Sequence, residues 1–189
     1  MTIFYIGWVL FFIPHFYSAA RSRVDGRDIR QKIGEAKYMG LYSVITGLGL
    51  SLLIWGYIKA PQGDVVFTGL HIFHHYAWVV MMPALILLIS AYTPLGYIKR
   101  AVQHPMMLAV LLWAVVHLAT GGDLKHVLLF GSFALYALVS LFYAYRREAQ
   151  LKDASPKLMG DIIAIFIGLA VSGALLHGLH KIAFGAPAI

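Results

Sequence analysis

Residues 102–120 read VQHPMMLAVLLWAVVHLAT and contain no Asp, Glu, Lys or Arg. A bilayer core about 30 Å thick is crossed by roughly 20 apolar residues of helix, so this run indicates a membrane-spanning segment. Five further stretches resemble it in length and composition. The predicted spans are residues 3–20, 38–58, 70–92, 102–120, 127–145 and 158–183. The sequence therefore predicts an all-α, polytopic membrane protein: one domain, residues 1–189, built as a bundle of six transmembrane helices.

The composition of the whole chain agrees with this fold class. Hydrophobic residues make up 60% of the chain and charged residues 12%, whereas a soluble domain carries roughly 25% charged residues. This excludes a soluble enzyme, a disordered regulator and a free nucleic-acid-binding module. Cysteine is absent, which excludes disulfides, iron–sulfur ligation, thiolate catalysis and covalent haem attachment. Any metal or haem would therefore depend on the nine histidines.

The basic residues predict the orientation of the spans. Twelve of the fifteen lie on one side of the predicted membrane: Arg21, Arg23, Arg27, Arg30, Lys32, Lys37, Lys99, Arg100, Arg146, Arg147, Lys152 and Lys157. Lys59, Lys125 and Lys181 lie on the other side. The positive-inside rule then places both termini in the periplasm of a bacterial inner membrane. The net charge of +7 is thus a topology signal, and no nucleic-acid partner is expected.

The loop at residues 21–37 combines six of these basic residues with Asp25, Asp28 and Glu35. Such a mixed but mainly basic segment beside a membrane span favours contact with anionic headgroups. We therefore expect a surface helix here, with membrane lipid as its partner.

The histidines are distributed unevenly across the predicted membrane. With a rise of about 1.5 Å per residue, His15 lies about 9 Å inside the cytoplasmic edge, and His104 begins the fourth span on that side. The other seven lie in the periplasmic half: His71, His74, His75, His117, His126, His177 and His180. A single histidine at a helix end commonly bonds headgroups or carbonyls, and this interpretation is preferred for His126 beside Lys125. Seven on one side favour a shared site, because intramembrane ionisable groups are costly and usually functional.

Neutral imidazole is a metal ligand and an axial ligand of haem iron. His71 and His75 are spaced i, i+4, and His177 and His180 are spaced i, i+3, so either pair could chelate a divalent metal. No carboxylate within a predicted span completes a hydrolytic metal site, and haem fits an apolar, aromatic-rich bundle better than zinc. Walker, GxSxG, HExxH and dinucleotide-binding motifs are absent from the sequence, which removes those reaction classes.

Two longer stretches suggest a family. Residues 81–92, MMPALILLISAY, and 98–138, IKRAVQHPMMLAVLLWAVVHLATGGDLKHVLLFGSFALYAL, resemble the core of the NnrU family of bacterial membrane proteins. IGEAKYMGLYSVITGLGLSLLIWGY at residues 33–57 and LHKIAFGAP at residues 179–187 extend the resemblance over nearly the whole chain. It implies a link to nitrite and nitric oxide metabolism in denitrifying bacteria. The same superfamily includes the 15-cis-zeta-carotene isomerase, which implies a non-covalent haem b held by histidine.

The resemblance also implies site residues. The recurrent histidines of the family match His15, His75, His104, His117 and His180, and the axial ligands of the isomerase branch match His15 and His117. His117 lies roughly 20 Å from the cytoplasmic edge, so a haem shared with His15 would lie nearly along the membrane. His75, at a depth similar to that of His117, fits an upright haem more easily. His117 is the candidate iron ligand that both arguments favour.

Three functions remain open at this point. The first is a haem b protein supporting denitrification or respiration, with respiratory partner proteins and a small apolar or gaseous ligand. The second is a haem-dependent cis–trans isomerase of a carotenoid-like polyene, in which case the protein is an enzyme. The third is a cofactor-free assembly or interaction protein.

Overall fold

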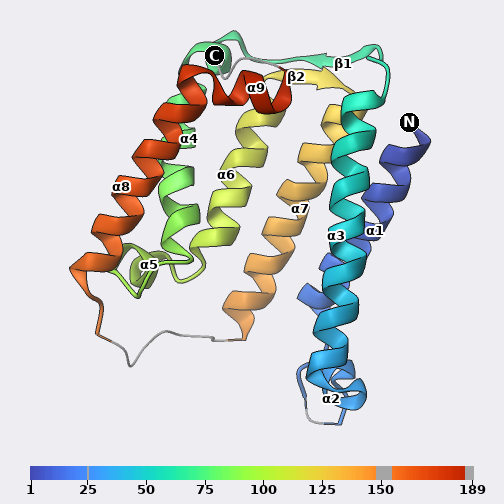
Figure 1. Cartoon of the computed structure of the whole chain (residues 1–189), viewed down its shortest axis with the longest axis vertical. Helices are drawn as coiled ribbons and strands as arrows, with labels where there is room; N and C mark the ends of the chain where they lie inside the picture. The colour runs from blue at the N-terminus through green and yellow to red at the C-terminus, as the bar shows by residue number, and fades with distance from the viewer. Residues whose placement is uncertain (25, 148–154, 186–189) are drawn as a thin grey trace. The chain divides into compact units, whose positions relative to one another are not determined.

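The computed structural model describes residues 1–24, 26–147 and 155–185, which are mainly helical (Figure 1). Asp25 and Lys152, named above for their charges, lie outside the described residues. The chain divides into two compact units, Met1–Gly63 and Asp64–Ile189.

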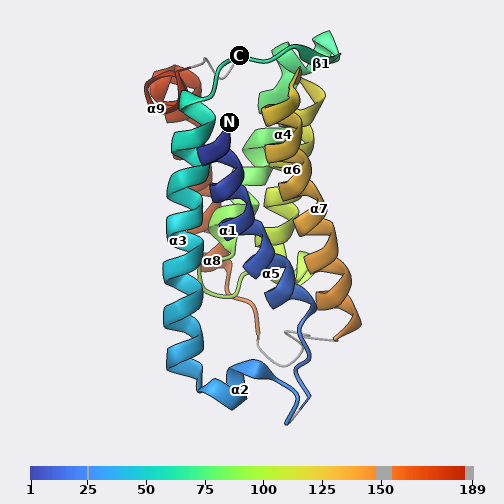
Figure 2. The same cartoon turned by 90° about the vertical axis from the view of Figure 1, so that its right-hand side faces the viewer.

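The first unit is a pair of long antiparallel helices, α1 (Thr2–Ala20) and α3 (Glu35–Lys59). In Figure 2, α1 begins beside one end of α3 and crosses it at an angle, and α3 extends beyond the other end of α1. Phe4 of α1 is fully buried and its ring lies 6.2 Å from that of Tyr57 in α3, where Leu53 is 1% exposed. Three glycines let the two backbones touch, because a Cβ at Gly7, Gly49 or Gly56 would meet backbone atoms of the facing helix within 2.2 to 2.6 Å. Small residues commonly permit such close packing between membrane helices.

The connection between these two helices folds on itself. In the described part of this connection, the one helix is the short α2 (Ile29–Ile33), which Gly34 ends with φ +88°. The predicted surface helix therefore covers only part of residues 21–37. Asp28 caps α2 by accepting a hydrogen bond from the backbone N–H of Arg30, 3.0 Å away. Asp28 also forms an ion pair with Arg21, and both side chains are buried. The Arg21 guanidinium in turn lies 5.5 Å from the centre of the Tyr38 ring at the start of α3.

This ion pair predicts a pH-dependent stability. The hydrogen bond from Arg21 holds the pKa of the Asp28 carboxyl below its usual range. A depressed pKa stabilises the fold at pH values above the unfolded pKa, and the stabilisation is lost as pH falls through the lower, folded pKa. Asp28→Asn keeps a capping oxygen and removes the charge. We expect the wild type to melt at a higher temperature than Asp28→Asn at pH 7, with the difference vanishing in strong acid. Melting both proteins from pH 7 to pH 2 tests this, and a difference independent of pH contradicts it.

The second unit is a row of helices in which α8 contacts α4, α4 contacts α6 and α6 contacts α7 (Figure 1). The bounds of these helices are α4 (His71–Ser90), α6 (Pro105–Ala119), α7 (Leu124–Arg146) and α8 (Leu158–Ala174). At one end, β1 (Val65–Thr68) pairs antiparallel with β2 (Gly121–Asp123). The same end carries a π-helical segment, η1 (Leu175–Leu179), and α9 (His180–Phe184).

A short helix, α5 (Tyr97–Val102), lies at the opposite end of the second unit. The buried Asp161 in the first turn of α8 accepts hydrogen bonds from the backbone N–H groups of Tyr97 (2.8 Å) and Ile98 (3.1 Å). The loop before α5 approaches α8 so closely that a Cβ at Gly96 would meet the Asp161 carboxylate at 2.1 Å. Asp161 therefore fastens α5 to α8 across a long stretch of sequence.

The prediction of an all-α membrane protein is confirmed, apart from the two short strands. Among the described residues, four helical segments are long and apolar enough to cross a bilayer: Thr2–Ala20, Glu35–Lys59, Leu124–Arg146 and Leu158–Ala183. His75–Ser90 and Pro105–Ala119 are apolar but shorter, so the presence of six transmembrane helices remains a prediction. The last segment is not one straight helix. Gly178, with φ +123°, interrupts it within η1, and α9 runs crosswise to α8 (Figure 1).

Candidate functional site

The candidate site is centred on His117 in the last turn of α6. Its Nδ1 lies 2.8 Å from the backbone carbonyl oxygen of Trp113. A carbonyl oxygen only accepts hydrogen bonds, so this nitrogen carries the proton and Nε2 keeps its lone pair. Histidines that bind metals are oriented by this kind of contact at the other ring nitrogen. The side chain of His117 is therefore fixed in the tautomer that a metal ligand at Nε2 needs.

His126 of α7 joins His117 from the neighbouring helix. Its Nε2–H donates to the backbone carbonyl of His117 at 2.7 Å. The carbonyl contact expected for His126 is thus present, but it connects His126 to the main candidate residue. Phe130, one turn further along α7, stacks on the His117 ring at 4.5 Å between centroids and 16° between planes. The His126 ring lies at the same 4.5 Å from Phe130.

His180, the first residue of α9, also lies near His117. The two ring centroids are 6.5 Å apart, with 28° between their planes. Two imidazoles that bind one metal atom have ring centroids at most about 6 Å apart, because each metal–nitrogen bond is about 2 Å long and the ring centre lies roughly 1 Å beyond the nitrogen. The spacing between His117 and His180 is close to that value. The interruption at Gly178, two residues earlier, is what turns the chain so that His180 leaves the line of α8. We call Trp113, His117, His126, Phe130 and His180 the His117 cluster.

An apolar cavity of about 180 Å³ adjoins this cluster. Side chains of α4 and α6 form its walls: Met81, Ala84, Leu85, Leu88, Ala109, Val110 and Trp113. Trp113 also belongs to the cluster, since its ring lies 5.2 Å from His117 and 4.9 Å from Phe130. Sites for drug-sized ligands usually measure about 300–1,000 Å³. This cavity therefore suits a small apolar molecule better than a large cofactor.

Of the five histidines predicted as candidates, the structure brings His117 and His180 together. His75 is exposed and lies beside His71, with 4.8 Å between ring centroids. His104 precedes α6 at its other end, 5.2 Å from the Tyr145 ring. His15 belongs to the first unit.

His15 is fixed much as His117 is. Its Nδ1–H donates to the carbonyl of Phe11 at 2.6 Å, and its half-buried ring lies 4.1 Å from the Phe11 ring and 5.4 Å from the Tyr42 ring. Within its own unit, His15 is therefore a histidine among aromatic rings whose Nε2 has the lone pair. Of the remaining histidines that were predicted on the periplasmic side, His177 is exposed, and the side chain of His74 lies outside the described residues.

His126 is the member of the cluster that sequence reasoning set aside. Helices α6 and α7 are consecutive and joined by a tight turn, in which Gly121 has φ +78° and Asp123 caps α7 by accepting from the N–H of His126 at 3.0 Å. Residues at similar distances before and after such a turn return to the same depth. Positions 117 and 126 lie at similar distances from the turn, and this spacing could have predicted from the sequence that His126 lies near His117.

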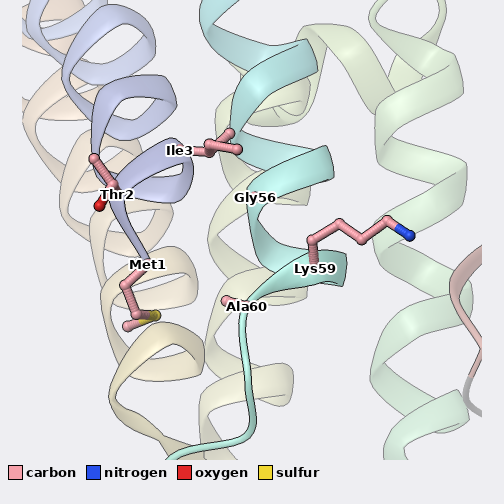
Figure 3. Close-up of a pocket in the computed structure, with 6 residues that line it drawn as sticks. All are labelled: Met1, Thr2, Ile3, Gly56, Lys59 and Ala60. Atoms are coloured by element: carbon pink, nitrogen blue, oxygen red, sulfur yellow. The ribbon is translucent and has the colours of Figure 1, made fainter.

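The first unit also has a cavity, of about 270 Å³, at the ends of α1 and α3. It is lined by Met1, Thr2, Ile3, Gly56, Lys59 and Ala60. Figure 3 shows the amine of Lys59 extending away from the other five residues. This lining provides neither imidazole nor carboxylate, and we assign it no chemistry.

The model of a family described as NnrU protein matches residues 3–188. No curated protein and no solved structure shows significant similarity to the chain.

Proposed function

The chain belongs to the NnrU family, and from this premise we propose that it binds haem b through histidine and supports nitrite and nitric oxide metabolism. We propose further that it lies in a bacterial inner membrane, with six transmembrane helices and both termini in the periplasm. The observation that supports haem binding is the orientation of His117, whose Nε2 has the lone pair and whose ring lies 6.5 Å from that of His180.

The donor set of the His117 cluster fits haem iron. His117 and His180 supply two imidazoles, the usual strong-field ligands of haem proteins, and Phe130 and Trp113 supply aromatic surface beside them. A bound haem would contribute one-electron chemistry. The protein's part is to fix the His117 tautomer through the Trp113 carbonyl and to surround the imidazole with apolar groups, which together tune the iron.

The cavity along α4 and α6 complements this arrangement. At about 180 Å³ it is too small for a haem, so it would serve a small apolar or gaseous ligand, while His117 and His180 would hold the haem. An apolar cavity of roughly 150 Å³ stays dry and accepts ligands such as xenon. A polyene isomerase needs a long apolar cleft, which this cavity does not supply, so we do not propose that activity.

Absorption spectroscopy tests the cofactor. We expect protein purified in detergent after expression with ample haem to show a Soret band, and His117→Ala to lose it completely. His117→Gln, which keeps a side-chain amide near the Trp113 carbonyl, should lose the band while melting close to the wild-type temperature. His177→Ala is the matched control, because His177 is exposed and lies three residues from His180; it should keep the band. A colourless wild type, or an unchanged band in both His117 variants, refutes haem binding at this cluster.

Complementation separates this function from a cofactor-free assembly role. A denitrifying strain lacking the gene should regain growth on nitrite with the wild type but not with His117→Gln. Full rescue by His117→Gln and by His180→Ala would instead favour the assembly protein, whose partner contacts do not depend on imidazole.

A further inference from the structure

A second pair of histidines lies on α4, outside the His117 cluster. The rings of His71 and His75 have centroids 4.8 Å apart with 60° between their planes, and both residues are exposed. They occupy positions i and i+4 of a regular helix that continues to Ser90, so they share one face. The backbone therefore holds the two side chains next to each other at the end of the helix.

The spacing of this pair corresponds to two ligands on adjacent positions of one metal ion. With metal–nitrogen bonds of about 2 Å and a ligand–metal–ligand angle of roughly 90–110°, two imidazole centroids stand about 4.5–5 Å apart. The observed 4.8 Å falls in that interval. The 6.5 Å between the His117 and His180 rings is longer than this interval.

We propose that His71 and His75 form a binding site for an exchangeable divalent transition-metal ion, with Cu²⁺ preferred over Ni²⁺ and Zn²⁺. Imidazole suits these borderline metals, and the order follows the general stability series of first-row ions. Two protein ligands leave the remaining positions to water or to another molecule, whereas a structural zinc site uses four protein ligands. Exchange with the surroundings follows from the exposure of both side chains.

This inference changes the role of His75. Sequence reasoning placed it beside His117 as a haem ligand, but its ring pairs with His71 on an exposed face. The proposed metal site shares no residue with the His117 cluster and does not depend on haem binding. If the protein does not bind a metal ion at His71 and His75, the result of the Soret experiment is unaffected. If the protein is colourless, the metal site can still be present.

Copper titration of the untagged full chain in detergent tests the site. We expect calorimetry to give one Cu²⁺ per chain and electron paramagnetic resonance to show hyperfine coupling to two nitrogen atoms. His75→Ala should weaken binding at least tenfold and remove one nitrogen from the spectrum, and the double variant His71→Ala/His75→Ala should abolish this binding. His177→Ala, another exposed histidine of the same unit, should bind as the wild type does. Wild-type stoichiometry and affinity in the double variant overturn the proposal.

A stability measurement distinguishes the loss of the metal site from misfolding of the variants. A ligand that binds only the folded state raises the melting temperature. Cu²⁺ should therefore stabilise the wild type and the His177→Ala variant but not the double variant, while all three melt alike in the presence of a chelator. Equal stabilisation of the double variant by Cu²⁺ would place the metal elsewhere and refute the assignment to His71 and His75.

Discussion

Gly56→Ala will separate the two helices of the N-terminal unit, whereas Gly47→Ala on the same helix will leave them packed. A Cβ at Gly56 would stand 2.4 Å from the backbone nitrogen of Phe4 and 2.5 Å from its Cα. Backbone atoms cannot rotate away as a side chain can, so α1 must move. The same Cβ at Gly47 meets nothing within 4 Å. We expect Gly56→Ala to lower the unfolding free energy by about 3 kcal/mol, the upper part of the range for overpacked sites.

Gly47→Ala is a sharp control because the two substitutions are chemically identical. Alanine is favoured over glycine in a helix by roughly 0.5–1 kcal/mol, so Gly47→Ala should be neutral or slightly stabilising. Gly7→Ala tests the same contact from α1, since its Cβ would lie 2.2 Å from the backbone nitrogen of Leu53. Circular dichroism melting in detergent measures all three. Equal melting temperatures for Gly56→Ala and Gly47→Ala would show that backbone contact between α1 and α3 does not hold this unit together.

Asp161→Ala should release α5 from the start of α8. The buried carboxylate accepts two backbone hydrogen bonds, from Tyr97 and Ile98. A hydrogen bond to a charged group contributes about 1.5–3 kcal/mol, so we expect a loss of about 3 kcal/mol. The released segment contains Lys99 and Arg100 and becomes a trypsin site. Limited proteolysis with mass spectrometry should find faster cleavage after these residues in Asp161→Ala than in the wild type.

Asp161→Asn is the matched variant for this prediction. It has nearly the same volume and keeps one oxygen that accepts a hydrogen bond, but it has neither the second acceptor nor the charge. We expect its rate of cleavage to lie between those of the wild type and Asp161→Ala. If trypsin cuts all three proteins at the same rate, Asp161 does not hold α5.

The main helices were predictable because long apolar runs and their punctuation are local signals. The run at residues 102–120 contains α6, with Pro105 at its first turn, as proline without an N–H allows. The break at Gly178 was not predictable in the same way. A glycine within an apolar run is tolerated in a helix, and nothing in its neighbours shows that its φ is +123°. The bond from Asp161 to Tyr97 joins residues far apart in sequence, which no local pattern reveals.

The candidate site was predictable only in part, for a geometric reason. Counting residues gives the depth of a side chain in a helix, but not the direction in which it points. Depth placed His75 near His117, whereas its direction on α4 pairs it with His71. The i, i+4 spacing of that pair was visible in the sequence. The meeting of His117 with His180 required the turn within η1, which only the structure shows.

The compactness of Met1–Gly63 has a consequence for how the protein is made. The N-terminus emerges from the ribosome first, and N-terminal units commonly fold before the rest of the chain is synthesised. The hairpin of α1 and α3 contains every residue of its own interface, so it can enter the membrane and close while the histidines of the second unit are still untranslated. A defect at Gly56 would therefore act during insertion, as a failure of biogenesis and quality control.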